Sequence, residues 1–428
     1  MRFLFSPPAE ATAGLLTLPW RHSLADWVDD RLVEVPQRGL SRHVVRFVAE
    51  AGEVFALKEI DVRLARKEYQ LLRQLTKLGI PAVQVLGVVI DRGIDRGVDR
   101  GVDRGADPGT ELDAILVTHF LDFSTSYRAL FANPRGQQLT DRLLDAQVEL
   151  LVRLHLAGFM WGDCSLSNTL FRLDAGALSA YLVDAETAEM HPTLSDGQRR
   201  YDVAMARERV GGELLDLQAG GFVSDDLDAI EIVDELARRY EALWAELTSE
   251  EVLLPEEQRY RIGERVRRLN ELGFDVDEIE LVDAGEGSRL RLTTRVAEPG
   301  HHRRLFFART GLDVQENQAR RLLADIASFR GYLEQTSRRP VPEAVAANRW
   351  LEEIYDPVIA SIPADLRGRL DDAQIFHEIL EHRWFLSEAA GKDIGTTAAA
   401  EDYLAQVLPA VPGDLVTGAV VPPALPPS

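Results

Sequence analysis

The feature that most constrains this 428-residue chain is a polar loop between two apolar patterns near its middle. Apolar residues recur at helical spacing from Leu143 to Leu156, which predicts a helix, and Gly158 suits the end of that helix. Two further apolar runs, one starting at Leu170 and the other ending at Val183, predict a β-hairpin. The polar residues between the helix and the hairpin are therefore expected in one short loop.

Three polar side chains in this segment have the spacing of a phosphoryl-transfer site. Asp163 and Asn168 lie five residues apart in the predicted loop, and Asp184 ends the second strand. One short loop can turn Asp163 and Asn168 toward the same point. We assign Asp163 as the catalytic base for a hydroxyl, and Asn168 and Asp184 as oxygen ligands of Mg²⁺. The alternative is that Asp163 and Asn168 are ordinary turn formers.

A lysine and a glutamate upstream complete the pattern. Residues 53–60 read as a strand that carries Lys58, and residues 65–75 read as a helix that carries Glu68. A lysine on such a strand binds the α- and β-phosphates of a nucleotide and pairs with a glutamate on the next helix. Lysine is scarce in a chain whose basic residues are mostly arginine, which makes Lys58 more notable. The alternative is that both residues are solvated.

Together these residues resemble the lipopolysaccharide kinases of the protein-kinase-like superfamily. The resemblance rests on Lys58, Glu68, the loop from Trp161 to Asn168 and Asp184, and aminoglycoside phosphotransferases are similar in the same places. It covers about residues 31–250. The likeness implies an α+β, bilobal fold that uses ATP and Mg²⁺ to phosphorylate a hydroxyl of a small molecule or of a sugar or glycan.

The resemblance also implies further nucleotide-binding residues. The loop that covers the phosphates would include Gly39 and Ser41, although it has one glycine where several are usual. The hinge whose backbone meets adenine would consist of four consecutive residues: Thr118, His119, Phe120 and Leu121. Glu186 is either a second metal ligand or a charge at the end of a strand.

Some positions depart from the family pattern. Trp161 and Gly162 precede Asp163, where the family usually has a His or an Arg. The metal motif is Asp184-Ala-Glu186, and no Ala-Pro-Glu segment follows it, which favours a small-molecule or glycan acceptor over a protein. The departures leave an alternative open, a weakly active or inactive kinase-like protein that binds nucleotide as a regulatory or scaffold module. Asp202 could support the loop, but we expect it to face solvent.

Composition changes along the chain predict its organisation. Residues 91–107 repeat Asp-Arg-Gly four times, which predicts a solvated insertion rather than a packed element. Ser224 is the expected start of a helix near 225–247. The predicted units are an N-terminal arm (1–30), an N-lobe with that insertion (31–121), a C-lobe (122–250), a C-terminal domain (255–408) and a disordered tail (409–428).

The C-terminal domain is predicted to mix helices with an antiparallel sheet. Its run from Phe376 to Glu388 resembles a domain of unknown function that bacterial proteins carry beside a kinase-like unit, and that likeness implies no activity. A helix is expected up to Leu272, followed by strands over about 278–312 that include a basic face. This face either binds a phosphate or a protein partner, or is simply solvated. The expected helices after it cover about 314–335, 342–360, 371–390 and 396–407.

Composition narrows the partners and the compartment. The formal net charge of −22 argues against nucleic acid as a partner. Cys164 is the single cysteine, which excludes a disulfide framework and fits the cytoplasm; we expect it to be a small buried filler. No apolar run reaches the ~20 residues that cross a bilayer, so no transmembrane segment is expected.

Overall fold

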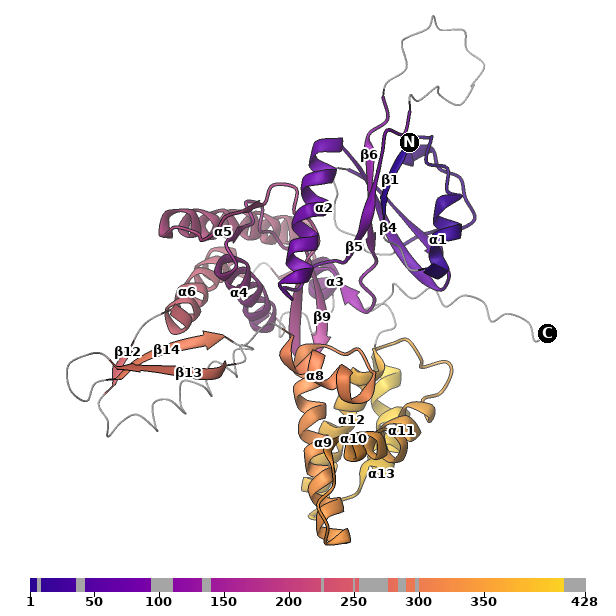
Figure 1. Ribbon diagram of the computed structural model, residues 1–428, viewed down its shortest axis with the longest axis vertical. Helices are drawn as coiled ribbons and strands as arrows, with labels where there is room; N and C mark the ends of the chain where they lie inside the picture. The colour runs from indigo at the N-terminus through magenta and orange to yellow at the C-terminus, as the bar shows by residue number, and fades with distance from the viewer. Residues whose placement is uncertain are drawn as a thin grey trace, which may run out of the picture.

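The computed structural model describes residues 1–5, 9–35, 43–93, 111–132, 140–224, 227–248, 251–253, 276–283, 290–296 and 300–411 (Figure 1). Helices and antiparallel sheets both occur, which confirms the α+β class. Several predictions lie outside the described residues: Gly39, Ser41, most of the Asp-Arg-Gly repeat, the helix before Leu272 and the tail beyond 411.

The first half of the chain forms a six-stranded antiparallel sheet of order β1-β5-β6-β4-β3-β2. In chain order its strands are β1 (Arg2–Phe5), β2 (Leu32–Val33), β3 (Val44–Glu50), β4 (Glu53–Ile60), β5 (Val85–Ile90) and β6 (Ala114–His119). The strands expected near 31–60, 83–89 and 114–117 are confirmed. Helix α2 (Val62–Lys77) follows β4, and the Asp61 carboxylate caps it by accepting the N–H groups of Arg63 and Leu64.

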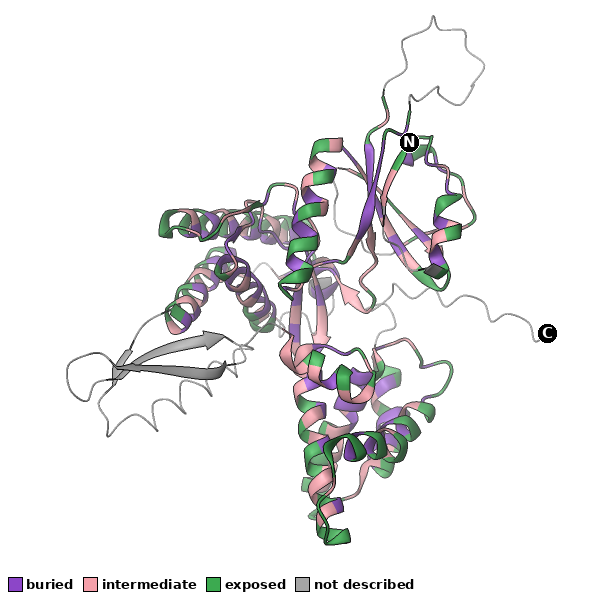
Figure 2. Ribbon diagram, viewed as in Figure 1, coloured by how far each residue is buried: buried purple, intermediate pink, exposed green. Residues whose placement is uncertain are grey.

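The N-terminal arm belongs to this sheet. Strand β1 pairs with β5, and helix α1 (Ala9–Leu16) precedes a buried pair of indoles, Trp20 and Trp27. Their rings meet edge to face with centroids 5.3 Å apart. These residues share one core with sheet residues such as Phe55 and Val117, so the arm covers one face of the sheet. Figure 2 shows buried residues concentrated on the strands and on the facing sides of the helices.

Helices and a hairpin form the next part of the chain. They are β7 (Ser124–Thr125), α3 (Tyr127–Ala132), α4 (Thr140–Leu156), β8 (Phe159–Met160), β9 (Thr169–Asp174), β10 (Ala177–Leu182), β11 (Glu189–Met190), α5 (Asp196–Ala219) and α6 (Ala229–Thr248). The predicted helices and hairpin are confirmed, and Gly158 has the positive φ of +80° expected after α4. Ser224 does not start α6, because the Asp228 carboxylate accepts the N–H groups of Ile230 and Glu231 instead.

A three-stranded antiparallel sheet follows α6. It consists of β12 (Glu251–Leu253), β13 (Val276–Asp283) and β14 (Leu290–Val296), in the order β12-β14-β13. The expected continuation of strands to residue 312 is wrong, because His301–Thr310 forms helix α8. Gly300 and Gly311, with φ of +77° and +76°, bound this helix, and Phe306 anchors it against Trp350.

The rest of the chain is a helical unit that begins with α8. It continues with α9 (Glu316–Ser337), α10 (Glu343–Trp350), a π-helical turn (Leu351–Tyr355), α11 (Asp356–Ala360), α12 (Asp372–Ala390), α13 (Thr396–Asp402) and two short turns to Ala410. Its core is aromatic: Trp350 stacks on Tyr355 with centroids 5.4 Å apart, and Phe376 lies 5.0 Å from Tyr355. The predicted helices of this unit are confirmed.

The helical unit docks onto the turn of the β9–β10 hairpin (Figure 1). Asp174, at the end of β9, is 1% exposed and accepts the N–H groups of Asn317 and Gln318 at 3.2 and 2.8 Å. These are orphan donors in the first turn of α9. The Gln374 side chain accepts the N–H of Ala175 at 2.9 Å. The docking therefore satisfies backbone groups at the hairpin turn and at a helix end together.

Candidate functional site

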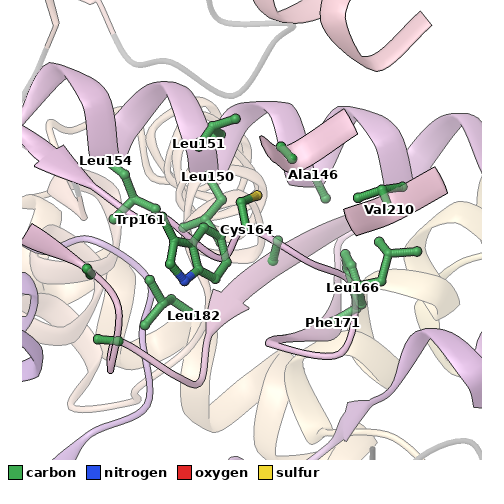
Figure 3. Close-up of a cluster of buried hydrophobic side chains, with 14 of the residues drawn as sticks. Ala146, Leu150, Leu151, Leu154, Trp161, Cys164, Leu166, Phe171, Leu182 and Val210 are labelled. Carbon is green, nitrogen blue, oxygen red and sulfur yellow. The ribbon is translucent and has the colours of Figure 1, made fainter. Parts of the chain in front are cut away.

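The loop between β8 and β9 is anchored by buried side chains. Trp161 and Cys164 are fully buried and lie near Leu150 and Leu154 of α4, whereas Leu166, which is 1% exposed, lies near Phe171 and Val210 (Figure 3). The Trp161 indole also donates to the backbone oxygen of Asp184 at 2.9 Å. The tryptophan that departs from the family pattern thus ties the loop to the end of the hairpin.

Cys164 is the buried filler that we expected from the sequence. Its thiol accepts a hydrogen bond from the Gln147 side chain at 3.1 Å. Burial, reinforced by the negative charge of Asp202, raises the pKa of the Cys164 thiol well above its ordinary value. This thiol is therefore not a nucleophile of the site.

Asp202, on α5, supports the same loop from a fully buried position. Its carboxylate accepts the N–H groups of Trp161 at 2.7 Å and of Gly162 at 2.8 Å, and it lies 3.0 Å from His155 Nε2. The expectation that Asp202 faces solvent is wrong. The reason is that α5 packs its inner face against the loop, where two backbone donors need an acceptor.

Glu213 was not predicted as a site residue, yet like Asp202 it accepts backbone N–H groups of the loop, closer to the end of the loop. Its carboxylate accepts the N–H groups of Leu166 at 2.7 Å and of Ser167 at 3.0 Å. Arg209, one turn before Glu213, places its Nε 3.0 Å from Asp163 Oδ1. The sequence held no local signal for either residue, because both contacts join segments more than forty residues apart.

Asp163 and Asn168 face one another across the loop. The Asn168 amide nitrogen donates to the backbone oxygen of Asp163 at 3.1 Å and to its carboxylate at 3.2 Å. This contact orients the amide so that its nitrogen is used within the loop and its oxygen is the atom suited to a cation. Both residues line a cavity of about 700 Å³ between the six-stranded sheet and α5.

The hairpin brings Asp184 to this cavity. Leu182 pairs with Thr169, and the N–H of Val183 donates to the backbone oxygen of Asn168 at 3.0 Å. Asp184 therefore follows directly after the point where the two strands meet the loop. Its Oδ1 accepts the N–H of Glu186 at 2.9 Å, which holds the carboxylate in a fixed orientation.

Lys58 crosses the cavity from β4 to meet these carboxylates. Its ammonium lies 3.1 Å from Glu68 Oε2, 2.7 Å from Asp184 Oδ2 and 3.8 Å from Glu186 Oε2. Lys58 and Glu68 are thus not solvated residues, since their side chains are 14% and 1% exposed. The structure brings together a lysine, a helix glutamate and a strand-end aspartate that are far apart in the sequence.

Burial and charge act in opposite directions on this cluster. Burial lowers the pKa of Lys58, but the attraction of Glu68 and Asp184 outweighs it, so the net pKa is raised. Burial and repulsion from Asp184 raise the pKa of Glu68 to about 7, although Lys58 opposes this. One ammonium therefore lies within 4 Å of three carboxylates, and it neutralises their combined charge only in part.

Glu186 belongs to the same end of the cavity. His43 Nε2 lies 2.9 Å from Glu186 Oε2, and Lys67 donates to the Glu186 backbone oxygen at 3.1 Å. The side chain of Glu186 is 26% exposed, so it is accessible from the cavity. This position keeps Glu186 available as a ligand, while its bond to His43 also supports a purely local role.

The predicted hinge also lines the cavity. The N–H groups of His119 and Phe120 donate to the backbone oxygens of Gln84 and Val54 at 2.8 and 2.9 Å. Thr118 and Leu121 lie on either side of them along the wall. The backbone donors of His119 and Phe120 therefore hold the hinge in the sheet, and its contact with adenine stays a prediction.

The candidate oxygen donors suit Mg²⁺, which binds few protein groups, better than they suit a metal whose ligands all come from the protein. Among the described residues, no group of three His, Cys, Asp or Glu side chains is arranged to hold a metal ion. Magnesium usually takes only one or two carboxylates and completes its shell with water and substrate phosphates. Asp184 and Glu186, with the Asn168 amide, match this donor set.

The basic residues predicted near the C-terminal sheet are on helix α8 and are largely paired. Arg303 lies 2.6 Å from Asp313, His302 lies 3.2 Å from Glu316, and Arg309 Nη2 lies 2.7 Å from Glu343. These partners come from the same helical unit. The expectation that these residues extend the basic strand face is wrong, because they form a helix whose cations pair with acids of the same unit. The basic side chains expected on β14 lie outside the described residues, so whether that face binds a phosphate or a partner, or is solvated, stays a prediction.

No helix within the described ranges combines the length and the apolar character needed to cross a bilayer. No curated protein matches the chain. A solved structure of WaaP in complex with acyl carrier protein aligns with 57% of this chain and 100% of its own, at 18% identity and a TM-score of 0.33. A score this low carries no argument about fold or function.

The C-terminal part gave a match to a family model. Residues 242–408 match a domain of unknown function, DUF4032, which confirms the resemblance noted from the run at Phe376–Glu388. The match covers less than half of the chain and leaves out every residue of the cavity described above. Its extent shows that the end of α6, the following sheet and the helical unit carry this family's sequence pattern.

Proposed function

We propose that this protein is an ATP- and Mg²⁺-dependent phosphotransferase of the bilobal kinase-like type, acting on a hydroxyl of a small molecule or sugar. The observation that carries the proposal is the convergence of Lys58 and Asp184 with the Asp163–Asn168 loop in one cavity, where the buried Glu68 holds Lys58 from behind. Phosphoryl transfer depends mainly on positioning and on charge neutralisation. A fixed ammonium, metal-binding oxygens and a carboxylate in one cavity meet these needs.

Each residue would have a separate role. Lys58, held by Glu68, would bind the α- and β-phosphates of the nucleotide. Asp163 would orient the acceptor hydroxyl and take up its proton as the new bond forms. The hydrogen bonds from the loop to Asp202 and Glu213 would keep the loop rigid, so that Asp163 needs no reorganisation during the step.

The metal-binding residues would be Asp184, Asn168 and, as an additional ligand, Glu186. When bound, Mg²⁺ would neutralise the charge of the β- and γ-phosphates. The ammonium of Lys58 lies 2.7 Å from Asp184, so the carboxylate that would hold the metal also positions the lysine that would bind the phosphates.

The acceptor side favours a small substrate. The cavity wall opposite the sheet is formed by α5, with Glu208, Gly212 and Asp216 beside Arg209. Hydroxyl side chains of Ser124, Ser165 and Ser167 also line it. Such short polar groups are suited to a polyol or sugar hydroxyl that enters the cavity.

The direct test is nucleotide turnover with a panel of sugar and small-alcohol acceptors. We expect Mg²⁺-dependent transfer by the wild-type protein and a loss of about 10²–10⁴-fold in Asp163→Asn, the range for a general base. Asp234→Asn is the matched control, because Asp234 is half-exposed on α6 and pairs only with Arg207 in the described contacts. Mg·ATP binding without transfer to any acceptor would support the regulatory alternative. No nucleotide binding would refute both.

A further inference from the structure

Three residues on one face of helix α5 contact successive parts of the loop that carries Asp163. Asp202, Arg209 and Glu213 are separated by seven and four residues, so they lie close to one line along a helix of ~3.6 residues per turn. Asp202 binds the start of the loop and Glu213 binds its end. Arg209 lies between these two anchors, of which Asp202 is fully buried and Glu213 is partly buried. Its backbone is therefore fixed relative to Asp163.

The contact between Arg209 and Asp163 is partial. Nε of Arg209 lies 3.0 Å from Asp163 Oδ1, while its side chain is 45% exposed and lines the cavity. The contact with Asp163 is made through Nε, so it does not require the two terminal nitrogens. A guanidinium has five donors in a planar fork, so most of its binding capacity faces the cavity. A half-exposed pair of this kind contributes little to stability.

The charges along the cavity explain why a cation is needed there. The carboxylates that line it are Asp163, Asp184, Glu186, Glu208, Glu213 and Asp216. Leaving the histidines aside, Lys58 and Arg209 are the basic residues among the described residues of the lining. Lys58 lies at the Asp184 end and Arg209 at the Asp163 end. A phosphoryl group arriving beside Asp163 would meet several negative charges, and Arg209 is the fixed positive charge that can offset them.

We propose that Arg209 is a catalytic residue whose terminal guanidinium nitrogens contact the phosphoryl oxygens as the group passes to the acceptor. This assignment rests on the proposed function. In that step the bond from phosphorus to the bridging oxygen of ADP breaks, and its electron pair leaves with ADP. The acceptor oxygen forms the new bond to phosphorus and gives its proton to Asp163. Arg209 stays protonated throughout and only changes contacts, from Asp163 toward the transferred group.

A binding experiment tests this role without a known acceptor. Aluminium fluoride with Mg·ADP mimics a phosphoryl group in transit, so it should tighten nucleotide binding in the wild-type protein by at least about tenfold. We expect Arg209→Ala to lose most of this tightening while it still binds Mg·ADP itself, and Arg209→Lys to retain part of it. Arg207→Ala is the matched control, since Arg207 lies two residues away on the same helix and pairs with Asp234 on α6.

The outcomes separate the two proposals. If Arg209→Ala keeps the full tightening, or if the wild-type protein binds Mg·ADP without any tightening, the role of Arg209 is overturned while nucleotide binding stands. If the wild-type protein binds no nucleotide, the proposed function itself fails. Once an acceptor is found, Arg209→Ala should lower kcat by about 10²–10³-fold with little change in KM for ATP. Added guanidinium should restore part of that rate, which a purely structural role would not allow.

Discussion

The two ends of the β9–β10 hairpin each carry an aspartate in a very different setting. At the turn, Asp174 is 1% exposed and accepts three hydrogen bonds, from Ser179 and from the backbones of Asn317 and Gln318. At the other end, Asp184 is 28% exposed and borders the cavity with Lys58 beside it. The first carboxylate is enclosed by donors, whereas the second has room for a ligand.

This contrast separates a structural acid from one suited to binding. Burial raises the pKa of Asp174 to about 6, despite the hydrogen bonds that lower it. The groups that contact Asp174 are neutral hydrogen-bond donors that enclose its carboxylate, so this residue is not suited to bind a metal or a phosphate. Asp184 instead shares a lysine with Glu68, and this incomplete neutralisation favours a further cation.

The largest expected effect would come from Asp184→Asn. Replacing the carboxylate by an amide would remove the main ligand of the proposed Mg²⁺ site, so Mg²⁺-dependent turnover should fall by about 10²–10³-fold or more. The thermal unfolding midpoint should change little, since Lys58 keeps its partner Glu68. A variant with unchanged Mg²⁺ dependence would show that Asp184 does not bind the metal and, like Asp174, only supports the fold.

Asp174→Ala should show the reverse behaviour. Loss of this carboxylate leaves the buried N–H of Gln318 and the partly buried N–H of Asn317 without an acceptor, which should lower the free energy of unfolding by about 2–4 kcal/mol. Nucleotide affinity, measured by calorimetry below the unfolding transition, should stay within about twofold. Asp313→Ala is the control, because its exposed pair with Arg303 should contribute only about 0–1 kcal/mol. Equal effects of the two variants would contradict the docking role.

The smallest effect concerns pH and Glu68. Because the folded protein raises the pKa of Glu68 from 4.5 to about 7, the folded state binds its proton more tightly than the unfolded chain. The resulting stability is present below pH 4.5 and is lost as the pH rises through 7. Glu68→Gln should therefore flatten the fall in the unfolding midpoint between about pH 5 and 7. Asp174, whose pKa is about 6, titrates in the same range in both proteins and so cancels in the comparison. A parallel slope in both proteins would show that Glu68 does not titrate there.

The sequence alone determined the elements whose signals are local. The helix before the loop, the hairpin and the strand of Lys58 were predicted from periodicity and spacing, because each pattern lies within a short window. Helix α8 was missed because its basic residues continue the composition of the strand before it. Its boundaries are set by the two positive-φ glycines, and its packing by Phe306 on Trp350.

The tertiary structure alone decided which polar residues support the site. Asp202, Arg209 and Glu213 look like ordinary surface residues of a helix, and only packing shows that their common face lies on the loop. In the same way, the sequence around Asp174 does not predict its contact with α9, which lies more than 140 residues away in the chain. Spacing along the chain specifies local geometry, but the partner of a buried charge depends on which surfaces pack together in space.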